Sequence, residues 1–201
     1  MAESQNGVSR LTLFISIAAA LLIGFLSGII YSDRSPGPGG EMTQQPGQPA
    51  QQQAAQLEQT IASLQLAAQQ NPNNAEIWTR LGHAYFDSDQ PAKAIESYTK
   101  SLAIIPDNPP VLTDLGVMYR RNGEPDKAIE MFDKALEINP TLEQAMFNKG
   151  IVLMNDLGDI NGALVTWKKL LQVNPEAKGP TGVPVSTMVE DISRQVQADG
   201  E

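Results

Sequence analysis

The chain has 201 residues, a formal net charge of −9 and no cysteine. An acidic protein repels phosphate backbones, and no stripe of lysine or arginine interleaved with aromatic residues offsets the charge. These features argue against a nucleic-acid binder, and the lack of cysteine excludes disulfides, thiolate metal sites and a covalent haem motif. The length allows one modest folded domain with additional segments.

The N-terminal segment predicts a membrane anchor. Residues 1–10 are polar, and residues 11–31 contain no charged side chain. A helix of this length, at about 1.5 Å per residue, spans roughly 30 Å, the thickness of a hydrocarbon core. A cleavable signal peptide is the alternative, but its apolar region usually covers about 7 to 15 residues and ends in a small-x-small site. The run here ends at Tyr31 after two isoleucines, so we favour an uncleaved transmembrane helix.

Charge and residue size around this run suggest its orientation and a packing face. Arg10 precedes the run and Arg34 follows it, so the positive-inside bias for a cytoplasmic N-terminus is slight. The remainder of the chain is then expected outside the cytoplasm. Small residues recur every four positions, a pattern that lets two membrane helices approach closely and makes a homo-oligomer possible: Ala20, Gly24 and Gly28.

Two segments are expected between the anchor and the main domain. Residues 32–53 are rich in proline, glycine and glutamine, which is typical of a linker. Residues 54–72 then show apolar residues at helical spacing, namely Leu57, Ile61, Leu64 and Ala68. Pro72 lies 34 residues before Pro106, so this helix is predicted to be a capping helix or half repeat.

The main domain repeats one pattern with a period of 34 residues. The first unit, 75–108, has its anchors at Trp78, Leu81, Gly82, Tyr85, Ala94, Tyr98 and Pro106. The second unit, 109–142, has them at Leu112, Leu115, Gly116, Tyr119, Ala128, Phe132 and Pro140. Apolar residues at i, i+3 and i+7 occur in two stripes separated by a polar break, so each unit is a helix hairpin. A fixed period in this range indicates an all-α solenoid of stacked units.

A third unit and a final helix follow. Residues 143–176 repeat the pattern with a one-residue insertion that falls in the turn at 155–159. Residues 184–197 are predicted to form an amphipathic capping helix, because a solenoid needs a covered end. Each unit has a helical glycine, which costs about 1 kcal/mol relative to alanine and therefore needs a packing reason. The glycines Gly82, Gly116 and Gly150 are expected to pack against Ala94, Ala128 and Ala163.

The pattern resembles the tetratricopeptide repeat family, whose Trp-Leu-Gly-Tyr-Ala-Phe-Ala-Pro ladder the second unit matches except for Leu112 in place of tryptophan. The third unit departs at four positions: Lys149, Leu153, Trp167 and Leu170. The resemblance implies a right-handed superhelix whose first helices line a concave groove for a peptide. The positions that correspond to this groove are Thr79, His83, Phe86, Thr113, Val117, Arg120, Phe147, Ile151 and Met154.

Two alternatives stay open for these positions. Val117, Ile151 and Met154 fit core positions as well, because apolar residues at helical spacing are often core. Some members of the family hold a terminal carboxylate with a lysine and asparagine clamp. Here the corresponding places hold Thr79, His83 and Asp114, so a hydrophobic or mixed peptide is expected instead.

No motif in the sequence carries a reaction. The single histidine, His83, has no cysteine, serine nucleophile motif or second histidine to work with. The acidic residues around Asp156 fail as a calcium loop, because the first ligand position would be Leu157 and the closing glutamate position is Lys168. We therefore expect no enzyme activity, no metal and no cofactor.

The anchor, the glutamine-rich linker and the closing segment from Trp167 to Leu171 resemble bacterial cytochrome c biogenesis accessory proteins. That resemblance implies a periplasmic repeat domain on the inner membrane that presents apocytochrome segments to the haem-attachment machinery. The alternative is a structural scaffold that self-assembles through the anchor and the solenoid ends, without a peptide client.

Overall fold

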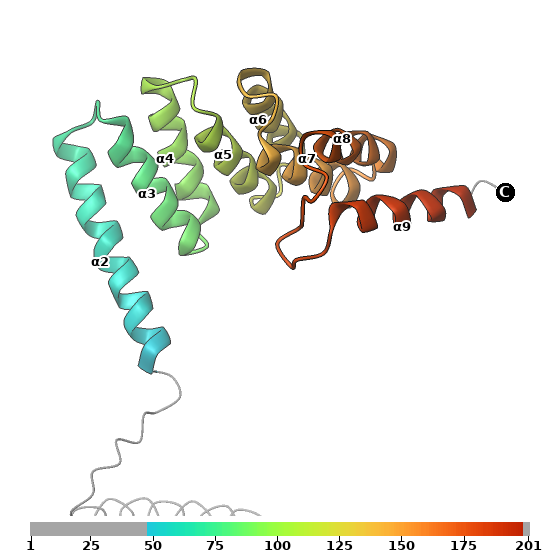
Figure 1. The fold of residues 1–201 in the computed structure, drawn as a ribbon. Coiled ribbons are helices and arrows are strands. Elements are labelled where there is room, and N and C mark those ends of the chain that lie inside the picture. The colour runs from blue at the N-terminus through green and yellow to red at the C-terminus, as the bar shows by residue number, and fades with distance from the viewer. Residues whose placement is uncertain (1–47, 199–201) are drawn as a thin grey trace, which may run out of the picture. The chain divides into compact units, whose positions relative to one another are not determined.

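The computed structural model describes residues 48–198, which form eight helices and one isolated antiparallel bridge. Helix α2 spans Gln48–Gln70, and three helix pairs follow: α3 (Ala75–Asp87) with α4 (Pro91–Ile104), α5 (Pro109–Arg121) with α6 (Pro125–Ile138), and α7 (Glu143–Asn155) with α8 (Ile160–Val173). Helix α9 (Val185–Ala198) comes last. For these residues the predicted all-α solenoid of helix hairpins is confirmed, and Figure 1 shows the pairs following one another in chain order.

The predicted transmembrane helix at 11–31 lies outside the described residues, and so does its small-residue face at Ala20, Gly24 and Gly28. Between residues 48 and 198, no helix combines the length and the hydropathy that crossing a membrane requires.

Helix α2 begins before the predicted start of the capping helix. The sequence predicts a linker through residue 53, but residues 48–53 are helical, so the linker prediction is wrong at its C-terminal end. Glutamine and alanine are good helix formers, and Pro49 lies in the first turn, where its missing N–H needs no partner. The apolar stripe packs toward α3, with Ile61, Leu64 and Ala68 buried.

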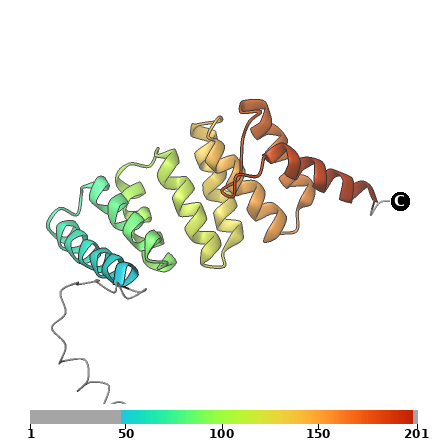
Figure 2. The ribbon, with the colours of Figure 1, turned by 60° about the horizontal axis from the view of Figure 1, so that its bottom comes forward.

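The three hairpins have closely matching helix lengths. The first helices α3, α5 and α7 each have 13 residues, and the second helices α4, α6 and α8 each have 14. Asn74 caps α3 and Asn108 caps α5 through side-chain oxygens that accept backbone N–H bonds. The extra residue of the third unit lies in the turn 156–159, which leaves both flanking helices at full length. Figure 2 shows the hairpins side by side along one direction.

The helical glycines pack against aromatic rings rather than alanines. A Cβ atom at Gly82 would lie 2.5 Å from the Tyr98 ring, and one at Gly116 would lie 2.6 Å from the Phe132 ring. At Gly150 the neighbour is Trp167. The predicted partners Ala94, Ala128 and Ala163 are fully buried, but they are not among the nearest neighbours of these glycines, so that prediction is wrong. A ring four residues after each alanine reaches across and fills the space that the glycine leaves.

The C-terminal cap is formed by a turn and α9. The backbone N–H of Gly179 donates to the Val183 carbonyl at 2.8 Å, and Lys178 pairs with Pro184 in the antiparallel bridge. This turn brings Val185 and Val189 of α9 into a core cluster with Trp167 of α8. The last hairpin is therefore covered by apolar side chains that follow it directly in the chain.

Candidate functional site

The predicted groove positions lie on α3, α5 and α7, whose exposed side we call the A face. Eight of the nine residues keep at least partial exposure, and Thr113 does not. Thr113 is 0% exposed, and its hydroxyl donates to the Pro109 carbonyl at 2.8 Å, one turn earlier in α5. Because this short side chain is bonded within its own helix, the prediction that Thr113 contacts a peptide is wrong.

Thr79 is partly buried and joins the two helices of the first hairpin. Its hydroxyl lies 2.7 Å from the hydroxyl of Ser101 on α4, which is itself buried. The polar atom of Thr79 is thus engaged between α3 and α4. A peptide on the A face would meet the side chains one and two turns further along α3.

Those further turns form a cavity of about 310 Å³ between α3 and α5. Its lining combines aromatic rings with carboxylates, and we call it the acidic cavity: His83, Phe86, Asp87, Tyr98 and Asp114. His83 Nε2 lies 3.1 Å from Asp114 Oδ2, which links the first repeat to the second. The His83 ring also meets the buried Tyr98 ring edge-on, with centroids 5.6 Å apart.

The carboxylates shape the electrostatics of this cavity. The hydrogen bond that Asp114 accepts from His83 raises the pKa of His83, and burial opposes that effect in part. Burial raises the pKa of Tyr98, and the charges of Asp114 and Asp87 add to the shift. Asp87 and Asp114 contribute to both shifts, whereas the positive charge of Arg121 opposes the shift of Tyr98.

Two arginines of α5 make contacts with neighbouring helices. The Arg121 guanidinium lies over the Phe86 ring at 4.4 Å from its centroid, within cation–π range. Arg121 also donates to the Phe86 carbonyl at 3.5 Å. Arg120 forms an ion pair with Asp156 at 2.5 Å, which ties α5 to the end of α7. Arg120 would have to exchange this partner before it could hold a peptide.

The A face is partly covered at its C-terminal end. Phe147 lines a second cavity of about 330 Å³ together with Lys178 and Gly179 of the C-terminal turn. A Cβ at Gly179 would lie 3.1 Å from the Phe147 ring, so the two segments are in close contact. Ile151 and Met154 pack against the C-terminal core cluster around Trp167. Val117 packs against the core cluster of the first two hairpins. These residues therefore have a structural role in addition to any binding role.

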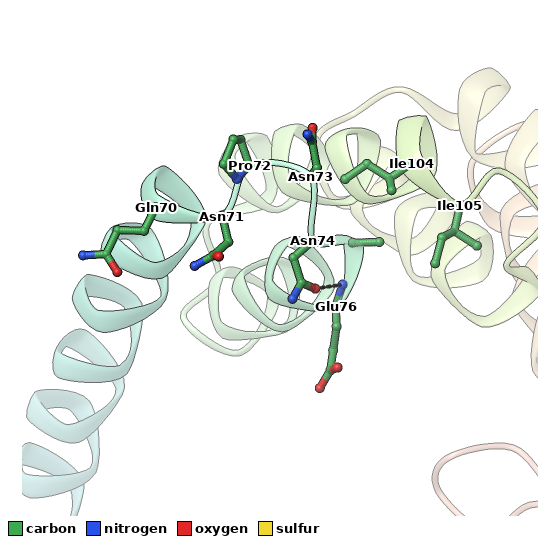
Figure 3. Close-up of a pocket in the computed structure, with 9 residues that line it drawn as sticks. Gln70, Asn71, Pro72, Asn73, Asn74, Glu76, Ile104 and Ile105 are labelled. Carbon is green, nitrogen blue, oxygen red and sulfur yellow. Dashed lines mark hydrogen bonds between the residues drawn. The ribbon is translucent and has the colours of Figure 1, made fainter.

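A third cavity, of about 590 Å³, lies where the connection from α2 to α3 meets the end of α4 (Figure 3). Its polar groups come largely from Asn71, Asn73 and Asn74. The Asn74 side chain accepts the backbone N–H of Glu76 at 3.0 Å and so serves as the helix cap. Since this polar side chain is used to start α3, we assign no site to the cavity.

The sequence pattern missed three residues of the acidic cavity and its edge: Asp87, Tyr98 and Arg121. The repeat pattern identifies Tyr98 only as an anchor of the first unit. Tyr98 is fully buried, and it also lines the cavity. One signal was available. The equivalent residue of the second repeat, Phe132, lacks the hydroxyl that Tyr98 carries.

Solved structures with the same arrangement of helices include a tetratricopeptide repeat protein from Parabacteroides merdae, with a TM-score of 0.62 and 23% identity over 73% of this chain and 56% of that one. MamA matches with a TM-score of 0.59 and 23% identity over 63% of this chain and 74% of that chain. The first repeat domain of Spaghetti (RPAP3), bound to the HSP90 peptide SRMEEVD, matches with a TM-score of 0.55 and 21% identity over 61% of this chain and 93% of that one.

The sequence matches no curated protein at a significant level. The family model described as tetratricopeptide repeat matches residues 73–141, which cover the first two hairpins. The match agrees with the 34-residue period, the helical glycines and the three hairpins of the structure. Residues 73–141 are therefore identified as tetratricopeptide repeats.

Proposed function

We propose that this protein is an interaction module that binds a peptide segment on the A face. The observation that carries the proposal is the acidic cavity, where one repeat meets the next and where His83, Phe86 and Asp114 gather on the exposed side of two first helices. A related fold, the Spaghetti domain, holds an HSP90 peptide, and this supports peptide binding by such a stack. Nothing in this role requires a catalytic group, so we propose no enzyme activity.

The peptide is proposed to differ from the acidic HSP90 tail. The SRMEEVD peptide ends in a valine and an aspartate and carries several carboxylates. In this chain the Asp114 carboxylate occupies the cavity, with a side-chain exposure of 21%. Like charges at close range in a partly buried site repel each other, so a hydrophobic or mixed segment fits the A face better.

A photo-crosslinking amino acid tests the proposal directly. In one variant the photo-crosslinking residue replaces Val117 on the A face, and in a control variant it replaces Lys134 on the opposite helix α6. Both variants are expressed as the full chain in cell membranes. Adducts with foreign polypeptides from Val117 alone are expected. Equal adducts from both positions would contradict a specific groove. Self-adducts alone would favour the second candidate, a scaffold that assembles from copies of this chain.

We further propose the cellular setting that the N-terminal sequence suggests. Residues 11–31 would anchor the protein in a bacterial inner membrane and leave the repeat domain in the periplasm, where it would assist assembly of envelope proteins such as c-type cytochromes. The uncharged run supports the anchor. Proteolysis of intact spheroplasts tests the orientation: digestion of the repeat domain is expected, and its protection would contradict the periplasmic location.

A further inference from the structure

We propose that the acidic cavity receives a positively charged side chain, arginine or lysine, from the bound peptide. This inference rests on the proposed function and adds the chemical character of the partner at one defined subsite. Three observations support it: carboxylate oxygens without partners, a buried hydroxyl without a partner, and aromatic walls.

The first observation concerns Asp87 and Asp114. Within residues 48–198, neither carboxylate oxygen of Asp87 has a hydrogen-bond or ion-pair partner, although the residue lines the cavity. Asp114 uses Oδ2 for His83, and its Oδ1 has no protein partner in the same region. Two carboxylates on facing helices thus keep acceptor positions available at one small cavity. Ionised carboxylates form their strongest hydrogen bonds with guanidinium and ammonium donors.

The second observation concerns Tyr98. Its side chain is 0% exposed, and its Oη is the one buried side-chain polar atom without a partner in the described part of the chain. An unsatisfied buried hydroxyl costs about 1–3 kcal/mol, whereas the Phe132 ring fills the equivalent place in the next repeat without that cost. The Tyr98 side chain lines the acidic cavity. The hydroxyl is covered in the free protein, so we propose that a basic side chain displaces the covering side chains and donates an N–H to it.

The third observation concerns the aromatic walls. Three of the five lining residues carry an aromatic ring: His83, Phe86 and Tyr98. One guanidinium of the chain already lies on this aromatic surface, because Arg121 stacks on the Phe86 ring. Arg121 itself does not line the cavity. Arg121 already has partners outside the cavity: it forms an ion pair with Asp89 at 3.6 Å and donates a hydrogen bond to the Phe86 carbonyl. A second cation inside the cavity would face the carboxylates, with aromatic surface around its stem.

An array of 12-residue peptides provides the test. The sequences are randomised without basic residues, and each is made in four versions that carry arginine, lysine, citrulline or norleucine at one central position. Citrulline preserves the shape of arginine without the charge. The labelled full chain in mild detergent is expected to bind the arginine and lysine versions at least about fivefold more strongly, because a charge-assisted hydrogen bond is roughly twice as strong as a neutral one.

Variants locate the charge preference. Asp87→Asn with Asp114→Asn should remove it. Tyr98→Phe should weaken the versions whose side chain donates an N–H, namely arginine, lysine and citrulline, and leave the norleucine version unaffected. Asp107→Asn with Glu137→Gln removes the same charge from exposed residues that line a different cavity, and this variant should retain the preference. The single variant Asp87→Asn is tested as well, because Asp87 has no protein partner to lose and its substitution should not disturb the fold.

The outcomes separate this inference from the proposed function. Equal binding of charged and neutral versions, weakened in both by Phe86→Ala, would overturn the cation subsite and leave the peptide groove intact. Preference that persists in the Asp87 and Asp114 variants would also overturn it, since the attraction would then come from the overall negative charge. Absence of binding to every peptide would overturn both proposals.

Discussion

The ring of Tyr98 lies so close to Gly82 that a Cβ there would come within 2.5 Å of two ring carbons. The same contact recurs between Gly116 and Phe132 in the second hairpin. Ring and glycine belong to the two helices of one hairpin, so each pair sets how closely those helices approach. The glycine that weakens the first helix is required by the aromatic residue of the second.

Gly116→Ala is therefore expected to destabilise the stack by about 1–3 kcal/mol, because the added methyl overlaps the buried Phe132 ring. Thermal and urea unfolding of the full chain measures the change. The control is the same substitution in a Phe132→Leu background, where the ring is absent. The two substitutions should then be non-additive, since residues in contact couple. Additive effects would show that the ring and the glycine do not determine the spacing.

Tyr98→Phe should leave the stability unchanged or raise it by about 1 kcal/mol, since it removes a buried hydroxyl that has no protein partner. The ring that packs on Gly82 is retained. Urea unfolding compares this variant with the wild type, and Phe132→Tyr serves as the reverse change in the second hairpin and should destabilise. A loss of stability in Tyr98→Phe would mean that the hydroxyl is satisfied in the free protein.

The histidine titration should report the pair between His83 and Asp114. The hydrogen bond raises the pKa of His83 above its ordinary value of 6.5, and NMR can follow it without ambiguity because the chain has one histidine. A raised folded-state pKa means that protonation of His83 stabilises the fold. That contribution is fully present below the unfolded-state pKa and is lost as the pH rises through the folded-state value.

Asp114→Asn should lower the pKa of His83, because it removes the largest cause of the increase. The stability difference between wild type and variant should grow as the pH falls through the titration. The His83 side chain is 51% exposed, so solvent screening keeps the effect small. An unchanged titration midpoint in Asp114→Asn would contradict the pairing.

Asp89→Gly should stabilise the protein by about 0.5–1 kcal/mol. Asp89 has a φ of 52°, the left-handed region that costs most residues about 1 kcal/mol or more, while the equivalent turn of the second hairpin has Gly123 at 80°. The ion pair of Asp89 with Arg121 is 3.6 Å long, and its carboxylate side is 84% exposed, so its loss costs little. Gly123→Asp is the matched reverse change. A lower melting temperature for Asp89→Gly would contradict this account.

The hairpins could be predicted from the sequence because a 34-residue period and the apolar spacing depend on local geometry alone. The start of α2 could not, since glutamine and alanine at 48–53 suit both a linker and a helix, and only the adjoining helical turns decide between them. The glycine contacts were misassigned for a related reason. Residue size suggested alanine as the partner, whereas the reach of a ring across the hairpin decides the contact.

The candidate site could be predicted only in outline. The spacing placed His83, Phe86 and Val117 correctly on first helices, but it could not show that Thr113 turns its hydroxyl to its own helix. It also missed Asp87 and Tyr98, because a cavity forms from residues of different helices and depends on side-chain packing. The covering of Phe147 by the C-terminal turn has no counterpart in the repeat pattern.

The most direct test of the account is an affinity measurement with a client polypeptide identified by crosslinking from Val117. Overlapping 15-residue peptides of that client would be titrated against the wild-type chain, Phe86→Ala, and Thr99→Ala on the opposite helix α4. One peptide should bind with one-to-one stoichiometry, and Phe86→Ala should weaken it about tenfold or more, which corresponds to about 1.4 kcal/mol. Thr99→Ala should bind like the wild type. Phe86→Ala is expected to melt at a lower temperature, because Phe86 packs against the core cluster, so each titration is made well below the melting temperature of the protein. Equal affinity for all three would contradict a binding site on the A face.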